Sequence, residues 1–200
     1  MARDLENVMP FPAIYEGRDL LHNLYPTPGK TGLRYGFLSK GEDLEALIAA
    51  DTAMLEQLGV THAQVADAIR KLFTEESTTD TLETLVLPQK FIHSPPCPWG
   101  DYSTTSPFAS PVPVVTQITV LNRDKIDEAL DEIEKIVESS SLEQSLEQLA
   151  DLVRRDLIML FSDLHPHLIE AHHFFEGQGN PYRVDPERAI RYLRIQPTAK

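Results

Sequence analysis

The sequence predicts an α+β fold in which about six helices pack on one side of a small, mainly antiparallel sheet. Two observations lead to this prediction. Residues 112–121 are rich in β-branched residues and alternate as a half-buried strand does, residues 85–92 alternate in part, and 33–38 is a possible third strand. Apolar residues recur at helical spacing in six other segments, which are 42–58, 61–73, 124–138, 142–161, 166–176 and 182–195.

The chain organisation follows from these elements. Residues 1–40 carry several prolines and glycines without a helical period, so we expect an irregular N-terminal arm. Residues 41–75 form a predicted helical hairpin lobe, in which Gly59 ends the first helix and Thr61 caps the second. Residues 84–200 form the predicted α+β core. A chain of 200 residues suits one compact domain overall.

Composition excludes several classes of partner. The net charge of −13 argues against a nucleic-acid backbone or an anionic membrane surface, since both are bound by basic patches. The longest apolar runs are only a few residues long, so no membrane span is expected. The single cysteine, Cys97, excludes an internal disulfide and suits a reducing compartment, and we therefore expect a cytoplasmic protein.

The predicted hairpin suggests one specific function. Its tight LGVT turn, followed by HAQVADAI, resembles the corner of DNA-binding helix-turn-helix domains over roughly 25 residues. That resemblance implies that the second helix reads DNA. Its first two turns, however, offer His62, Gln64 and Asp67, while the basic residues Arg70 and Lys71 come late. This order disfavours DNA binding.

A crowded histidine segment points to a different function. Four of the seven histidines lie between residues 164 and 174, around a short helix predicted at 166–176. Helical spacing places His172 on the apolar face, with Glu176 one turn further on and able to orient it. A neutral histidine oriented by a carboxylate suits metal ligation or general base catalysis. The alternative is a core histidine hydrogen-bonded to a carboxylate or a backbone carbonyl.

The long loop between the two predicted strands is a second place where a site could form. His93 and Cys97 lie four residues apart on a proline-stiffened backbone, and Trp99, the only tryptophan, follows. Alternatively, Trp99 covers the open face of the sheet and Cys97 is a small buried apolar residue.

These two segments together give the main functional hypothesis. We expect a small-molecule or metal site where the 93–101 loop meets the 165–176 helix, with a transition metal such as zinc as the cofactor, since zinc takes nitrogen and sulfur ligands. The candidate ligands are His172, Glu176, His93, Cys97, His165 and His167. HExxH and HxxEH spacings are absent, and no reaction type can be derived.

The alternative hypothesis is a non-catalytic interaction module. In the predicted helix 124–138, the face opposite the apolar stripe is acidic, with lysines only at 125 and 135. Such a face is either a solvated surface or a docking site for a basic protein partner.

Overall fold

The computed structural model describes residues 37–38, 41–73, 97–99, 101, 117–139, 142–180 and 182–198, together with three two-residue strands. These strands are β1 (Ile14–Tyr15), β2 (Arg18–Asp19) and β3 (Thr84–Leu85). The described part contains six α-helices and antiparallel strands, which confirms the α+β class. Most of the expected N-terminal arm and most of the expected strands 33–38 and 85–92 lie outside the described residues.

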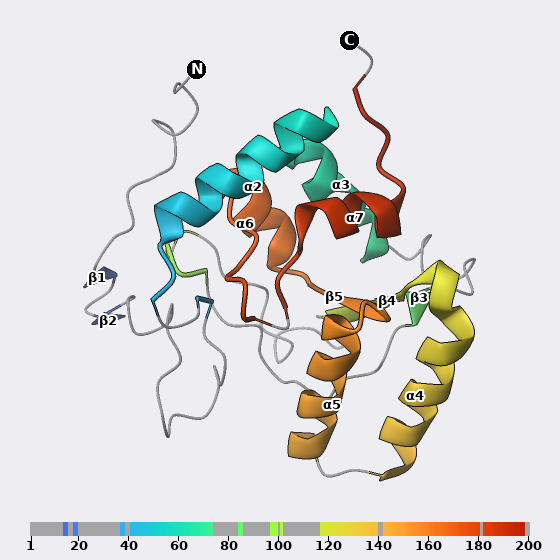
Figure 1. Ribbon diagram of the computed structural model, residues 1–200. Helices are drawn as coiled ribbons and strands as arrows, with labels where there is room; N and C mark the ends of the chain where they lie inside the picture. Colours follow the sequence, from blue (N-terminus) through green and yellow to red (C-terminus); the bar gives the residue numbers. More distant parts are fainter. Residues whose placement is uncertain are drawn as a thin grey trace, which may run out of the picture.

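A three-stranded antiparallel sheet occupies the middle of the molecule (Figure 1). Its order is β3–β4–β5, with β4 (Gln117–Leu121) at the centre and β5 (Ile158–Ser162) beside it. Ile118 lies opposite Phe161 in this register, and Val120 lies opposite Met159. β1 and β2 pair separately with each other, also antiparallel.

Strand β5 corrects the prediction of one helix over 142–161. Helix α5 (Leu142–Arg154) ends early, Asp156 takes a left-handed backbone with φ 56°, and the chain then enters the strand. All residues from Leu157 to Phe161 are buried. A short apolar run buried on both faces lacks the alternation of an ordinary strand, so periodicity cannot separate it from a buried helical segment.

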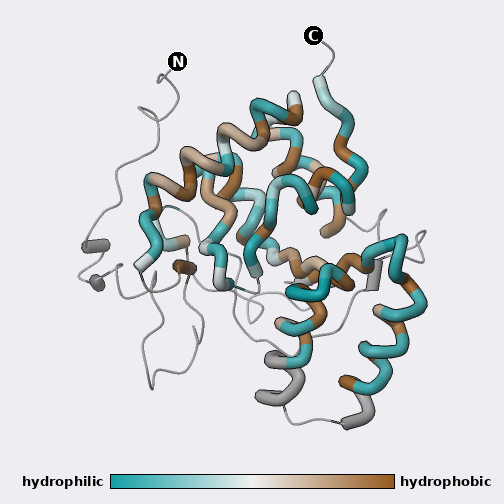
Figure 2. The backbone as a smooth tube through the Cα atoms, viewed as in Figure 1, coloured by the Kyte–Doolittle hydropathy of each residue, from teal (hydrophilic) through white to brown (hydrophobic). Residues whose placement is uncertain are grey.

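Helices cover both faces of the sheet, not one as predicted. Ile118 and Phe161 belong to a core shared with α2 (Leu44–Leu58), α3 (His62–Leu72), α6 (His165–His172) and α7 (Pro186–Leu193). Leu121 and Leu160 belong to a core shared with α4 (Ile126–Ser139), which follows the 3-10 turn η3 (Arg123–Lys125), and with α5. Figure 1 shows α4 and α5 below the sheet and the other helices above it, and Figure 2 shows hydrophobic residues concentrated between them.

The predicted hairpin 41–75 is formed by α2 and α3. Gly59 closes α2 with a left-handed φ of 68°. Thr61 then caps α3 through a reciprocal pair of hydrogen bonds with Gln64, which satisfies two backbone donors at the helix start. Helix α3 packs on α6, and its Val65 and Ile69 are fully buried. None of the helices in this described part of the chain has the length and apolar character needed to cross a bilayer.

A smaller core, called the second core below, lies beside α2 and α6. It joins residues from five places in the chain, namely Phe37, Leu38, Leu47, Ile48, Cys97, Trp99, Leu164, Leu168 and Phe174. Trp99 is 2% exposed here, stacked on α6. The second core therefore fixes the 97–99 segment against the helix that carries the crowded histidines.

A buried ion pair fastens the loop after α6 to α2. Arg183 donates to both carboxylate oxygens of Asp51, with Nη2–Oδ1 and Nη1–Oδ2 separations of 2.5 and 3.1 Å. The same guanidinium donates to the backbone carbonyl of Glu176 at 2.5 Å. Burial raises the pKa of Asp51, and the nearby Arg183 opposes this effect.

We predict that Arg183→Met lowers the free energy of unfolding by about 3–5 kcal/mol, because it leaves the Asp51 charge buried without its partner. Urea denaturation measures this loss. Arg154→Met is the matched control, since it removes an exposed ion pair with Asp151 and should cost under about 1 kcal/mol. The double variant Asp51→Leu/Arg183→Met should recover part of the loss, and a double variant no more stable than the single one would contradict this explanation.

A second prediction concerns His62, whose ring stacks on that of His173 with centroids 3.9 Å apart. Burial, with a further contribution from His173, lowers the pKa of His62 from 6.5 to about 4. As the pH falls, His62 is therefore protonated in the unfolded chain before it is protonated in the folded protein. The contribution of the neutral ring to the free energy of unfolding is fully present above pH 6.5 and is lost as the pH falls toward 4. His62→Phe keeps a stacked ring without the titration, so it should lose about 1 kcal/mol less than the native protein between pH 7.5 and about pH 5.5. Equal losses in urea denaturation would refute this role.

Candidate metal centre

Four potential metal ligands meet where α6 faces the 97–101 segment. They are Cys97, Asp101, His167 and His172, and the donor atoms all lie within 4.8 Å of one another. Within the described ranges, this is the one group of three or more histidine, cysteine, aspartate or glutamate side chains close enough to share an ion. The structure thus brings together three of the six ligands predicted from sequence and adds Asp101.

Local structure explains how each pair of ligands is presented. On α6, Pro166 occupies the first turn, and the helix ends when His173 takes a left-handed backbone with φ 54°. His172 therefore lies in the last turn, 1% exposed, as its position on the apolar face predicted. On the other segment, Trp99 lies between Cys97 and Asp101 and is anchored in the second core. The anchored indole holds both neighbouring ligands beside α6.

The distances between donor atoms resemble the edges of a tetrahedron. His172 Nε2 lies 3.5 Å from Cys97 Sγ and 3.2 Å from His167 Nε2. Asp101 Oδ1 lies 3.0 Å from His167 Nε2 and 3.2 Å from His172 Nε2. Zinc bond lengths of about 2.0–2.3 Å in tetrahedral geometry require edges of about 3.3–3.6 Å. These four separations are close to such edges, and all of the donor atoms lie within 4.8 Å of one another.

The pKa of His172 and the pKa of Asp101 are both shifted in the direction that favours the metal-binding form of the side chain. Burial lowers the pKa of His172, although the Asp101 carboxylate opposes this effect, so the ring is neutral at pH 7. Burial alone would raise the pKa of Asp101, but hydrogen bonds from Cys97 and His167 outweigh it and hold this pKa below its ordinary value. A neutral imidazole and an ionised carboxylate are the states in which these side chains bind metals.

Hydrogen bonds alone cannot account for all the side chains that contact Nε2 of His172. An imidazole nitrogen carries either one proton or one lone pair, so it makes one good hydrogen bond. Three side chains nevertheless converge on Nε2 of His172, including both oxygens of Asp101 at 3.2 and 3.1 Å. A shared cation would satisfy all of these atoms at once.

The same atoms do not form a cysteine–histidine–aspartate catalytic relay. A relay requires the nucleophile on one imidazole nitrogen and the orienting carboxylate on the other. Here Cys97 and Asp101 both contact Nε2 of His172. Its Nδ1 is buried and has no hydrogen-bond partner among the residues that the structure describes.

Two other predicted ligands, His165 and Glu176, form a separate hydrogen-bonded pair. The Ser162 backbone N–H donates to His165 Nδ1 at 2.9 Å, so Nε2 carries the proton and donates to Glu176 Oε1 at 2.9 Å. Asn180 donates to the other oxygen of Glu176 at 2.5 Å. Glu176 therefore orients His165, whereas the sequence suggested that it orients His172. His93 lies outside the described residues.

Asp101 is the candidate ligand that sequence reasoning missed. It follows Cys97 by four positions, and this Cys-x3-Asp pair faces the His-x4-His pair of α6. The proline-rich sequence that drew attention to Cys97 lies just before Asp101, and this was the available signal. Carboxylates are abundant in this acidic chain, which obscured the signal.

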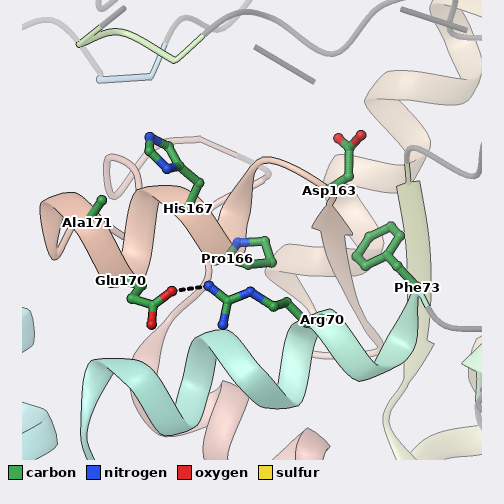
Figure 3. Close-up of a pocket in the computed structure, with 7 residues that line it drawn as sticks. All are labelled: Arg70, Phe73, Asp163, Pro166, His167, Glu170 and Ala171. Atoms are coloured by element: carbon green, nitrogen blue, oxygen red, sulfur yellow. Dashed lines mark hydrogen bonds and ion pairs between the residues drawn. The ribbon is translucent and has the colours of Figure 1, made fainter. Parts of the chain in front are cut away.

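A small cavity of about 280 Å³ lies next to α6, between it and α3 (Figure 3). The residues lining it are Arg70, Phe73, Asp163, Pro166, His167, Glu170 and Ala171. Arg70 pairs with Glu170 across it, and Figure 3 shows the His167 ring turned away from that pair. The His167 side chain therefore lines the cavity at its rim, while its imidazole contacts the other members of the four-ligand cluster.

Neither a protein family model, nor a curated protein, nor a solved structure matches this chain.

Proposed function

We propose that this protein binds a divalent transition metal, zinc above all, through Cys97, Asp101, His167 and His172. The observation that carries this proposal is that one sulfur, one carboxylate and two imidazole groups place their donor atoms within 4.8 Å of one another. Convergence of this kind without a cation crowds several polar groups on the buried Nε2 of His172, which can make only one good hydrogen bond.

The chemistry of the ligands supports a divalent, borderline-soft ion. A thiolate and a carboxylate bring two negative charges, the two neutral imidazoles bring none, and a divalent cation balances the sum. Thiolate and imidazole favour zinc and similar transition metals, whereas magnesium and calcium prefer sets made entirely of oxygen. A reducing compartment such as the cytoplasm would keep Cys97 unoxidised, so that it can lose its proton and bind the metal as the thiolate.

The coordination number supports a structural role. Four protein ligands fill the tetrahedral shell of zinc, whereas catalytic zinc keeps one position for water. The ligands also come from distant parts of the chain, with Asp101 and His167 separated by 66 positions and Cys97 and His172 by 75. A bound ion would therefore fasten the 97–101 segment to α6.

We predict about one zinc per chain, measured by elemental analysis of protein purified without a histidine tag or chelator and then dialysed against zinc. His172→Ala should abolish this stoichiometric binding while the circular dichroism spectrum stays native. His165→Ala is the matched control, because His165 is buried on the same helix but bonds to Glu176 outside the cluster. It should retain the zinc and lower the melting temperature. Full zinc occupancy in His172→Ala would contradict the proposal.

Cobalt substitution tests the sulfur ligand directly. Cobalt bound to a thiolate gives a charge-transfer band in the near ultraviolet, and tetrahedral cobalt gives strong visible bands. Cys97→Ser should remove the first, and Asp101→Asn should weaken metal affinity. A charge-transfer band that survives in Cys97→Ser would show that Cys97, the only cysteine, is not the source of the band.

We propose a second candidate function, the docking of a basic protein partner on α4. Leu130 is a large apolar side chain that is 40% exposed. Asp127, Asp131 and Glu134 are exposed beside it at helical spacing. Arg155 already neutralises the neighbouring Glu128 and Glu132. The surface formed by Leu130 and these three acidic residues would bind a partner helix that has one apolar side chain surrounded by lysine or arginine residues.

Charge reversal tests this candidate. The variant Asp127→Lys/Asp131→Lys/Glu134→Lys should weaken binding to a synthetic basic amphipathic helix by at least about tenfold, as measured by fluorescence anisotropy, because like charges would then face each other. Reversal of Glu45, Glu56 and Glu187, which are exposed on other helices, makes the same change in net charge. Equal loss in both variants would reduce the interaction to non-specific attraction and refute the docking site.

A further inference from the structure

We infer that Trp99 is a positioning residue of the metal centre, which holds the His172 imidazole in the plane that directs Nε2 at the other three ligands. This inference rests on the proposed metal site and names the residue that preorganises it.

The geometry of the two rings supports this role. The indole of Trp99 and the imidazole of His172 are stacked with centroids 4.1 Å apart and planes only 5° from parallel. Both residues are buried, with 2% and 1% of their surface exposed. A parallel stack fixes the plane of the smaller ring, which the broad torsional preference of a histidine ring would otherwise leave free to turn.

His172 lacks the restraint that usually performs this task. A metal-bound histidine ordinarily donates its other ring N–H to a carboxylate, a carbonyl or a water, and that bond sets the ring orientation. The Nδ1 atom of His172 is buried, with no hydrogen-bond partner in the described ranges. His165, on the same helix, has both ring nitrogens hydrogen-bonded. His172 therefore has the aromatic stack, and no hydrogen bond at Nδ1 from the described residues, to fix the plane of its ring on the side away from the other ligands.

The position of Trp99 in the chain links it to three of the four ligands. It lies two residues from Cys97 and two from Asp101, and its ring contacts His172. Phe174 holds the indole from a second side, edge-on, with centroids 5.6 Å apart and planes at 65°. Because the second core fixes Trp99, the same ring positions the loop ligands and the buried helix ligand relative to each other.

Zinc affinity in three variants tests the inference, measured on the full chain by competition with a chelator of known affinity. Trp99→Leu should weaken zinc binding by about 10–100-fold, as loss of an orienting contact does at other metal sites. Trp99→Phe restores a flat ring and should bind nearly as tightly as the native protein. Phe37→Leu is the matched control, since it removes an aromatic ring from the same second core. It should lower the melting temperature and leave zinc affinity unchanged.

Cobalt spectra supply a readout that packing alone would not change. With saturating cobalt, Trp99→Leu should keep one ion per chain and the thiolate charge-transfer band, but with altered visible bands, because His172 is no longer held in one orientation. Trp99→Phe should restore the native spectrum.

The outcomes separate this inference from the proposed function. Native zinc affinity and native cobalt bands in Trp99→Leu would overturn the positioning role while leaving the metal site intact. Equal weakening in Phe37→Leu and Trp99→Leu would also overturn it, since the effect would then be general to the second core. A native protein that takes up neither zinc nor cobalt would remove both the site and its positioning residue.

Discussion

The pairing of β4 with β5 is the interaction on which the rest of the structure depends. β5 is buried by helices on both faces, so its position is fixed on both sides and by the β4 ladder. Helix α6 begins three residues after this strand, and the last strand residue, Ser162, hydrogen-bonds to the first helical one, His165. The sheet thereby sets where α6 starts and which way its histidines face.

Helix α6 carries two buried histidines in contrasting surroundings. The nitrogens of His165 each have one partner, and its neighbour Glu176 is in turn bonded by Asn180. Such a closed network is stable by itself. His172 has three side chains crowded on one nitrogen and no described partner on the other. The difference is why we assign ligand binding to His172 and a structural role to His165.

Much of the fold could be predicted from the sequence wherever local chemistry decides the outcome. The hairpin followed from Gly59 and the Thr61 cap, and the burial of His172 followed from helical periodicity. Strand β5 was missed because a doubly buried strand carries no alternation. The placement of helices on both faces was missed because the alternation within 112–121 predicted one solvated face, whereas Ile118, Thr119, Val120 and Leu121 are all buried.

The candidate site was predictable as a meeting of two segments, but its ligand set was not. Glu176 lies one helical turn beyond His172, which suggested a contact that an uninterrupted helix would make. The left-handed turn at His173 ends the helix first and sends Glu176 to His165. Asp101 belongs to the cluster through a tertiary contact 66 positions away in sequence, and no local pattern encodes such a contact.

The lone cysteine has a consequence for how the chain could be cross-linked. This chain cannot form an internal disulfide, yet a metal shared by Cys97 and His172 would close a loop across 75 positions. A link that closes a loop of that length would add about 4 kcal/mol to the free energy of unfolding, mainly because it lowers the conformational entropy of the unfolded chain. Unlike a disulfide, such a link forms under reducing conditions, and its strength rises with the concentration of free metal. The free energy of unfolding of the protein would then rise and fall with the metal supply of its surroundings.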